Sequence, residues 1–93
     1  MSASTLKRIR ASEPEFPARA LLKGVSGWVE MEFTVKTDGW LRDVQVRQAE
    51  PAGVFDNAAL EAMRHWRFAP VLKDGKAVEQ RAWIRMRFTA QKD

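Results

Sequence analysis

The sequence contains no cysteine and a single histidine, His65. The lack of cysteine excludes a disulfide framework, a thiol redox centre and a cysteine-ligated zinc site, and one histidine leaves almost no ligands for a transition metal. Ser26 lacks the spacing of a nucleophile elbow. We interpret His65 as a surface residue beside Glu61, one helical turn earlier, rather than as half of an acid/base couple. The sequence therefore predicts a protein that is not an enzyme and uses no metal or cofactor.

Long hydrophobic runs are also missing. The longest uninterrupted apolar runs have three residues, as at positions 20–22, whereas a membrane helix needs about 20, and no secretory signal is recognisable. The length of 93 residues and the apolar content of 45% fit one small domain. The net charge of +4 suits nucleic acid, an anionic surface or ordinary solubility alike. Residues 1–4 read as a domain boundary, which predicts that the chain is part of a longer protein.

The amino-terminal part of the chain carries little periodic signal. Residues 1–15 are polar and basic without a sustained period, so we expect them to be extended or partly disordered. After them, Pro17 suits the first turn of a helix and Gly24 suits the position just past its end. The sequence therefore predicts a short helix over residues 17–23.

A hairpin of two strands is predicted next. Apolar and polar residues alternate over positions 27–36, as in a half-buried strand. Asp38 and Gly39 supply the backbone conformations of a tight turn, after which the chain returns as a second strand over residues 41–49. Leu41 breaks the alternation of this second strand, and we expect a bulge or a late start of the strand near Arg42.

A second helix is predicted after the loop around Pro51. Asp56 can cap it by accepting hydrogen bonds from free amides, and Pro70 closes it. Its apolar residues recur at spacings of three and four, which is typical of one buried helix face. They are Phe55, Ala59, Ala62, Met63 and Trp66. We expect Trp66 to belong to the core rather than to a recognition site.

A third strand follows a turn at residues 73–76. Its predicted inward-facing residues are Ala82, Ile84, Met86 and Phe88, and its predicted outward-facing residues are Arg81, Trp83, Arg85, Arg87 and Thr89. The order helix, strand, strand, helix, strand predicts an α+β fold: a three-stranded antiparallel sheet with two helices on one face.

The charge pattern indicates the order of the strands. Glu30 and Glu32 face outward from the first strand, whereas the outward charges of the other two strands are cations. We therefore place the acidic strand in the centre, where each cross-strand ion pair contributes about 0.2–1 kcal/mol. The third strand then lies at an edge, where unpaired backbone groups accept a partner strand. We expect residues 13–17 to form one wall of a pocket beside it.

The exposed position of Trp83 among arginines has two interpretations. It forms a docking wall for a peptide or a stacking platform for a base, or it simply covers the outer face of the sheet beside Trp28. A nucleic-acid interface is the competing function, but Glu30 and Glu32 occupy the adjacent strand and no aromatic RNA-binding signature is present. We therefore expect no nucleic-acid partner.

Several short motifs occur along the chain in a fixed order. They are Pro14-Glu15-Phe16-Pro17 with Ala20, Gly24-Val25-Ser26-Gly27, Phe33-Thr34-Val35 with Asp38-Gly39, Asp43-Val44-Gln45-Val46, Pro51-Ala52-Gly53 with Phe55-Asp56, and Ala62-Met63-Arg64-His65-Trp66-Arg67-Phe68-Ala69-Pro70. In this order and spacing they resemble the C-terminal domain of the TonB family over residues 13–90. Residues 1–12 are then expected to be a flexible arm or linker remnant.

The resemblance implies the receptor-binding domain of a periplasmic energy transducer that is anchored in the inner membrane. Members of this family capture the Ton box of outer-membrane receptors as a strand added to the third strand. The ExbB and ExbD motor then supplies proton-motive force to pull on the receptor and admit iron chelates or cobalamin. The residues that the resemblance assigns to the partner are Glu13, Pro14, Glu15, Phe16, Pro17, Arg81, Ala82, Trp83, Ile84, Arg85, Met86, Arg87, Phe88 and Thr89.

Two features leave alternatives open. The family usually has glutamine where this chain has Glu13 and Glu15, which changes the charge offered to a receptor. The C-terminal domain of TolA is similar in architecture and is the alternative family, although its motifs are less clear in this sequence. Free sheet edges also permit a homodimer.

Overall fold

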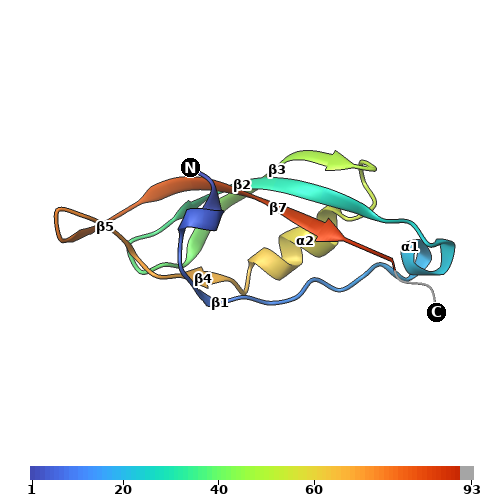
Figure 1. The fold of residues 1–93 in the computed structure, drawn as a ribbon, viewed down its shortest axis with the longest axis horizontal. Coiled ribbons are helices and arrows are strands. Elements are labelled where there is room, and N and C mark those ends of the chain that lie inside the picture. Colours follow the sequence, from blue (N-terminus) through green and yellow to red (C-terminus); the bar gives the residue numbers. More distant parts are fainter. Residues whose placement is uncertain (91–93) are drawn as a thin grey trace.

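The computed structural model describes residues 1–90. Its centre is a three-stranded antiparallel sheet in the order β3-β2-β7, formed by β2 (Gly27–Val35), β3 (Leu41–Glu50) and β7 (Gln80–Phe88). Helix α2 (Asp56–Met63) packs on one face of this sheet, and α1 (Ala18–Lys23) lies at one end of the molecule and adds Ala20 to the same core (Figure 1). The predicted α+β fold is confirmed.

The acidic strand β2 occupies the centre of the sheet. It pairs with β7 from Gly27–Phe88 to Val35–Gln80 without any shift of register. Its outward carboxylates meet cations of both neighbours: Glu30 lies 3.4 Å from Arg85, and Glu32 lies 3.2 Å from Arg81 and 3.1 Å from Arg47. Each exposed pair adds only about 0–1 kcal/mol, but together they fix which strand lies beside which, as the charge pattern predicted.

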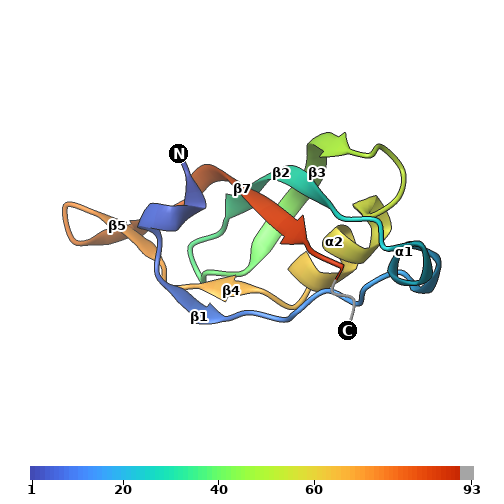
Figure 2. The same ribbon diagram turned by 45° about the vertical axis from the view of Figure 1, so that its right-hand side comes forward.

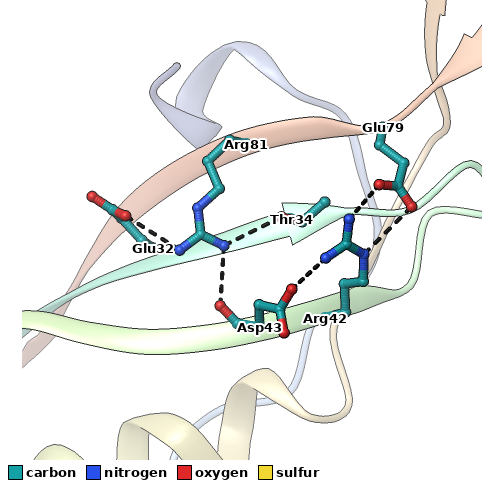
Figure 3. A network of polar contacts seen from close by, with 6 residues as sticks. All are labelled: Glu32, Thr34, Arg42, Asp43, Glu79 and Arg81. Atoms are coloured by element: carbon teal, nitrogen blue, oxygen red, sulfur yellow. Dashed lines mark hydrogen bonds and ion pairs between the residues drawn. The ribbon is translucent and has the colours of Figure 1, made fainter.

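A bulge in β3 turns a backbone carbonyl toward β7. The register between β2 and β3 shifts between Glu32 and Thr34, where Asp43 of β3 has a φ of +53°. The Arg81 guanidinium donates to the carbonyl of Asp43 at 3.1 Å and to Thr34 Oγ1 at 3.2 Å, and it also reaches Glu32 (Figure 3). The predicted bulge is confirmed, and through it one side chain of β7 binds both other strands.

A second arginine joins the other end of the same network. Arg42 donates from Nε and Nη2 to the carboxylate of Glu79 and from Nη1 to Asp43 (Figure 3). The hydrogen bond from Arg42 and its positive charge hold the pKa of Glu79 below the ordinary value. A carboxyl with a lowered pKa stabilises the fold above its unfolded pKa, and this contribution is lost as the pH falls through the folded value.

This network gives the first testable prediction. Replacing Arg42 by glutamine should raise the pKa of Glu79 toward the ordinary value of a glutamate, because the positive charge and the two-pronged guanidinium donor are removed. A pH titration of the side-chain carboxyl carbon of Glu79 by NMR measures the change. Arg47→Gln is the matched control, since Arg47 pairs with Glu30 and Glu32 instead. An identical Glu79 titration in wild type and R42Q would contradict the network.

Aromatic side chains fill the core between the sheet and α2. Phe33 and Phe68 are fully buried and stack with ring centroids 5.7 Å apart, and Phe55 stacks on Phe88 at 4.5 Å. Trp66 is 5% exposed. The predicted apolar face, Phe55, Ala59, Ala62, Met63 and Trp66, is buried throughout.

The predicted end of the second helix is wrong. Helix α2 ends at Met63 rather than near Pro70. The residues that follow leave the helix because Arg67–Phe68 forms strand β4, which pairs with β1 (Arg8–Arg10). This pairing joins segments about sixty positions apart, a contact that helical periodicity cannot indicate.

The predicted helix cap at Asp56 is also wrong. Asp56 is the first residue of α2, and Phe55 at the capping position makes no side-chain hydrogen bond to the helix. The Asp56 carboxylate instead accepts a hydrogen bond of 3.0 Å from the amide of Gly53. It therefore closes the loop before the helix. Its negative charge lies in the first turn, where it interacts favourably with the positive end of the helix dipole.

The amino-terminal segment is more ordered than predicted. It contains a 3-10 turn η1 (Ala3–Thr5), where the expectation of an extended or partly disordered segment is wrong, and strand β1, which is extended as expected. Ala3 is fully buried, and the indole nitrogen of Trp66 donates to the carbonyl of Ser12 at 2.9 Å. The segment begins beside β7, crosses the molecule and from β1 onward runs along its lower side toward α1 (Figure 2).

A small hairpin projects from the end of the molecule opposite α1. It consists of β5 (Val71–Lys73) and β6 (Lys76–Val78), joined through Asp74 and Gly75 at φ +52° and +78° (Figure 1). The turn was predicted and is confirmed, whereas its two short strands were not predicted. Within residues 1–90 no helix has the length and apolarity to cross a bilayer.

Candidate partner-binding site

The outer edge of β7 presents backbone groups to the surroundings. The amide of Trp83 donates to the carbonyl of Met1 at 2.9 Å and therefore points away from β2. Backbone groups of an antiparallel strand alternate in direction, and the register with β2 has no shift. The amides of Arg85 and Arg87 consequently point outward as well, and within residues 1–90 no backbone or side-chain acceptor bonds to them.

A hollow of about 460 Å³ borders this edge, and we call it the edge groove. It lies between β7 and the extended segment that runs toward α1. Its lining residues are Arg8, Ala11, Ser12, Glu13, Pro14, Trp66, Ile84, Arg85, Met86 and Arg87. A strand paired with β7 would place alternate side chains into the edge groove, because side chains of a strand alternate between the two faces of a sheet.

The amino-terminal residues that were assigned to a partner lie in different places: some line the edge groove, and others pack in the core or adjoin α1. Glu13 and Pro14 line the edge groove, and Glu15 is exposed. Phe16 instead packs edge-on against Phe55 and Phe88, with centroids 5.4 and 5.9 Å away. Pro17 caps α1. Only the first half of this segment therefore lies where the sequence analysis placed a pocket wall.

The predicted site residues of β7 alternate between the buried and the outer face of the sheet. Ala82, Met86 and Phe88 are buried, and Ile84 is partly buried against the core. Arg85 and Arg87 are exposed. Thr89 is exposed and follows the last residue of the strand. A partner on this edge would therefore meet the backbone of every second residue and, of the inward side chains, Ile84 and Met86 where they line the edge groove.

Each tryptophan of the outer face lies under an arginine. Arg85 lies 3.9 Å above the ring of Trp28, and Arg47 lies 5.7 Å from the ring of Trp83. Trp83 is half-buried and opposite Glu32, whereas Trp28 is opposite Arg87. Trp83 therefore covers the outer face together with Arg47 and does not lie beside Trp28, so the predicted neighbour of Trp83 is wrong.

Four residues of the site, Arg8, Ala11, Ser12 and Trp66, were not predicted. Arg8 stacks at 4.7 Å on Trp66 in the edge groove, and Ser12 accepts from the indole of Trp66. Trp66 was predicted only as a core residue, but one side of its ring forms part of the groove. The contacts join positions more than fifty residues apart, and no local pattern of the sequence signals them.

A larger hollow of about 660 Å³ lies away from the edge of β7, between α1 and the loop after β3. Proline and small aliphatic side chains line most of it, with Arg19 and Lys23 at α1. No residue of β7 contributes to it, so it is not continuous with the edge groove.

The histidine lies on the surface. His65 is 62% exposed in its side chain, and its Nε2 lies 3.8 Å from a carboxylate oxygen of Glu61. The predicted surface histidine beside its helical neighbour is confirmed. Over residues 1–90, no three His, Asp or Glu side chains gather as metal ligands would.

Comparison with known proteins points to one family. Residues 12–90 match the family model of the Gram-negative bacterial TonB protein C-terminal. Protein TonB of Pseudomonas aeruginosa is 35% identical over 82 residues, which cover 88% of this chain and 24% of that protein. Protein TonB of Escherichia coli K12 is 37% identical over 68 residues, which cover 73% of this chain and 28% of that protein. The chain thus spans about a quarter of the length of these relatives.

Two solved structures have the same fold. The solution NMR structure of the Pseudomonas aeruginosa TonB CTD superposes with a TM-score of 0.79 at 34% identity and covers 97% of this chain and 91% of that one. The TonB2 protein from Vibrio anguillarum superposes with a TM-score of 0.71 at 36% identity and covers 92% of this chain and 82% of that one. Sequence and fold therefore agree on the similarity.

Proposed function

Because the chain belongs to the TonB C-terminal family, we propose that it is the receptor-binding domain of a TonB-type energy transducer. In this proposal it captures the Ton box of outer-membrane receptors in the periplasm as a strand added to β7. The remainder of the full-length protein anchors it in the inner membrane and couples it to ExbB and ExbD. The proton-motive force is thereby delivered as a pull on receptors for iron chelates or cobalamin.

The observation that carries this proposal is the free edge of β7 beside the edge groove. The outward amides of Arg85 and Arg87 offer hydrogen bonds to a strand, and Ile84, Met86 and Trp66 offer contact to its alternate side chains. Each new backbone hydrogen bond contributes about 0.5–1.5 kcal/mol net. A few such bonds together with side-chain contacts reach the micromolar range, which requires about 8 kcal/mol, and binding of this strength remains reversible.

The proposal predicts the outcome of an NMR titration with a synthetic Ton-box peptide. Amide shifts should concentrate on residues 84–89 and on Ser12 and Glu13 across the edge groove, because the peptide fills the space between them. The matched control is the same peptide with N-methyl groups on the amides that face β7, which should bind at least tenfold more weakly. A flat titration to millimolar peptide would overturn the proposal.

Salt dependence distinguishes this proposal from binding to nucleic acid. A strand held by backbone hydrogen bonds should lose little affinity between 50 and 200 mM salt, whereas contacts to several phosphates weaken steeply over about this range. A single-stranded RNA of mixed sequence serves as the comparison ligand. If the RNA shifts Arg81, Arg85 and Arg87 more strongly than the peptide does, the edge of β7 has a different role.

A further inference from the structure

The β7 edge is already occupied at Trp83 by the chain itself. Ser2 forms a parallel bridge with Trp83, and the amide of Trp83 donates to the carbonyl of Met1 at 2.9 Å. Figure 1 and Figure 2 both show the amino terminus lying across the start of β7. We call residues 1–5 the amino-terminal clasp.

The clasp is held by burial as well as by its pairing with Trp83. Ala3 is fully buried and belongs to the main core, although its neighbour Ser4 is exposed. The Ser2 side chain accepts from the amide of Ser4, and the amide of Leu6 donates to the carbonyl of Ala3 at 3.0 Å. These bonds close η1 and hold its one inward side chain against the sheet.

The clasp ends where the edge groove begins. Trp83 pairs with the clasp, and the next residues, from Ile84 to Arg87, line the edge groove. A strand that pairs only with the back half of β7 meets the outward amides of Arg85 and Arg87. A strand that pairs along the whole of β7 would also need the amide of Trp83, which already donates to Met1.

We propose that the amino-terminal clasp is a competing strand that regulates access to the β7 edge. This inference rests on the proposed function, because it concerns how the same edge receives its partner. With the clasp in place, a partner strand pairs with the back half of β7 alone. Release of the clasp frees the backbone of Trp83, lengthens the pairing and tightens binding.

A pair of matched variants tests this regulation. Ala3→Gln places a larger polar side chain at a buried position and should release the clasp. Ser4→Gln introduces the same side chain at the exposed neighbouring position and should leave the clasp in place. Amide hydrogen exchange of Trp83 should accelerate at least tenfold in A3Q and remain unchanged in S4Q. Synthetic Ton-box peptide should bind A3Q at least threefold more tightly than it binds wild type or S4Q.

A second variant tests the opposite state of the same protein. The chain has no cysteine, so Ser2→Cys with Trp83→Cys introduces a single disulfide between two bridged positions, which locks the clasp onto β7. The oxidised form should bind the peptide at least threefold more weakly than the reduced form. This comparison needs no released state and remains decisive if A3Q does not fold.

The outcomes separate the regulation from the proposed function. If Trp83 exchanges rapidly in A3Q and the peptide binds A3Q no more tightly than wild type, the competition is overturned while capture of the peptide stands. Equal affinity of the oxidised and reduced forms overturns it in the same way. If the peptide binds none of these proteins, the proposed function fails and the regulation fails with it.

Discussion

Replacing Gly39 by alanine should lower the free energy of unfolding by about 3 kcal/mol. Gly39 has a φ of +89°, a conformation that costs another residue about 1–2 kcal/mol. An added Cβ would also lie 1.9 Å from the carbonyl oxygen of Phe68. Strand β4 would have to move away, and the 2.9 Å hydrogen bond from the Phe68 amide to the carbonyl of Gly39 would break, at a further cost of about 1–3 kcal/mol.

Gly75→Ala is the matched control for this prediction. Gly75 has a similar φ of +78°, but a Cβ there would meet nothing within 4 Å. Its substitution should therefore cost only the conformational part, about 1–2 kcal/mol. Denaturation by urea, followed by tryptophan fluorescence, measures both variants. Equal losses of stability would show that the close approach of Gly39 to β4 contributes nothing.

Replacing Arg87 by proline should abolish detectable binding of a Ton-box peptide while the domain remains folded. Proline removes the outward amide, and its ring occupies the space where a partner strand would lie. The amides that pair with β2 belong to the alternate residues and are kept, so the sheet should survive. Arg87 is preferred to Arg85, because Arg85 also binds Glu30 and stacks on Trp28.

Arg87→Ala is the control that separates the backbone from the side chain. Alanine keeps the amide and removes the guanidinium. The affinity for the peptide should therefore fall by less than about tenfold, which corresponds to about 1.4 kcal/mol of binding free energy. Circular dichroism and the thermal midpoint of each variant check that both are folded. Undiminished binding by a folded R87P protein would overturn pairing along this edge.

The main sheet could be predicted because its signals are local and repeated. Alternating residues in β2 and β7 specify their buried faces, and the charges of Glu30, Glu32 and their arginine partners specify which strand is central. The bulge at Asp43 was visible as a change of parity within one strand. The alternation and the change of parity are each visible within about ten consecutive residues, whereas the charge signal combines residues of different strands.

The amino-terminal segment and β4 could not be predicted, because their order depends on distant partners. Ile9 is the one residue of 8–10 that favours a strand, and the segment is exposed throughout. It is held by pairing with Phe68 and by the stacking of Arg8 on Trp66. Tertiary contacts of this kind override weak local propensity.

The candidate site was predictable in outline and not in detail. The charge pattern identified β7 as an edge strand, and the structure adds which amides face outward. It could not reveal that Phe16 belongs to the aromatic core, since a lone aromatic between two prolines carries no periodicity. Nor could it reveal that Ser2 lies on the same edge.

The unbroken register between β7 and β2 determines where the assembly would part under mechanical load. Nine consecutive residue pairs join the two strands, so a force along β7 is shared in shear by all the rungs of that ladder. A partner strand held only by the outward amides beyond Trp83 has fewer rungs. It would slide off before β7 separates from β2. The partner contact would therefore break first under load, and the domain would stay folded and able to bind again.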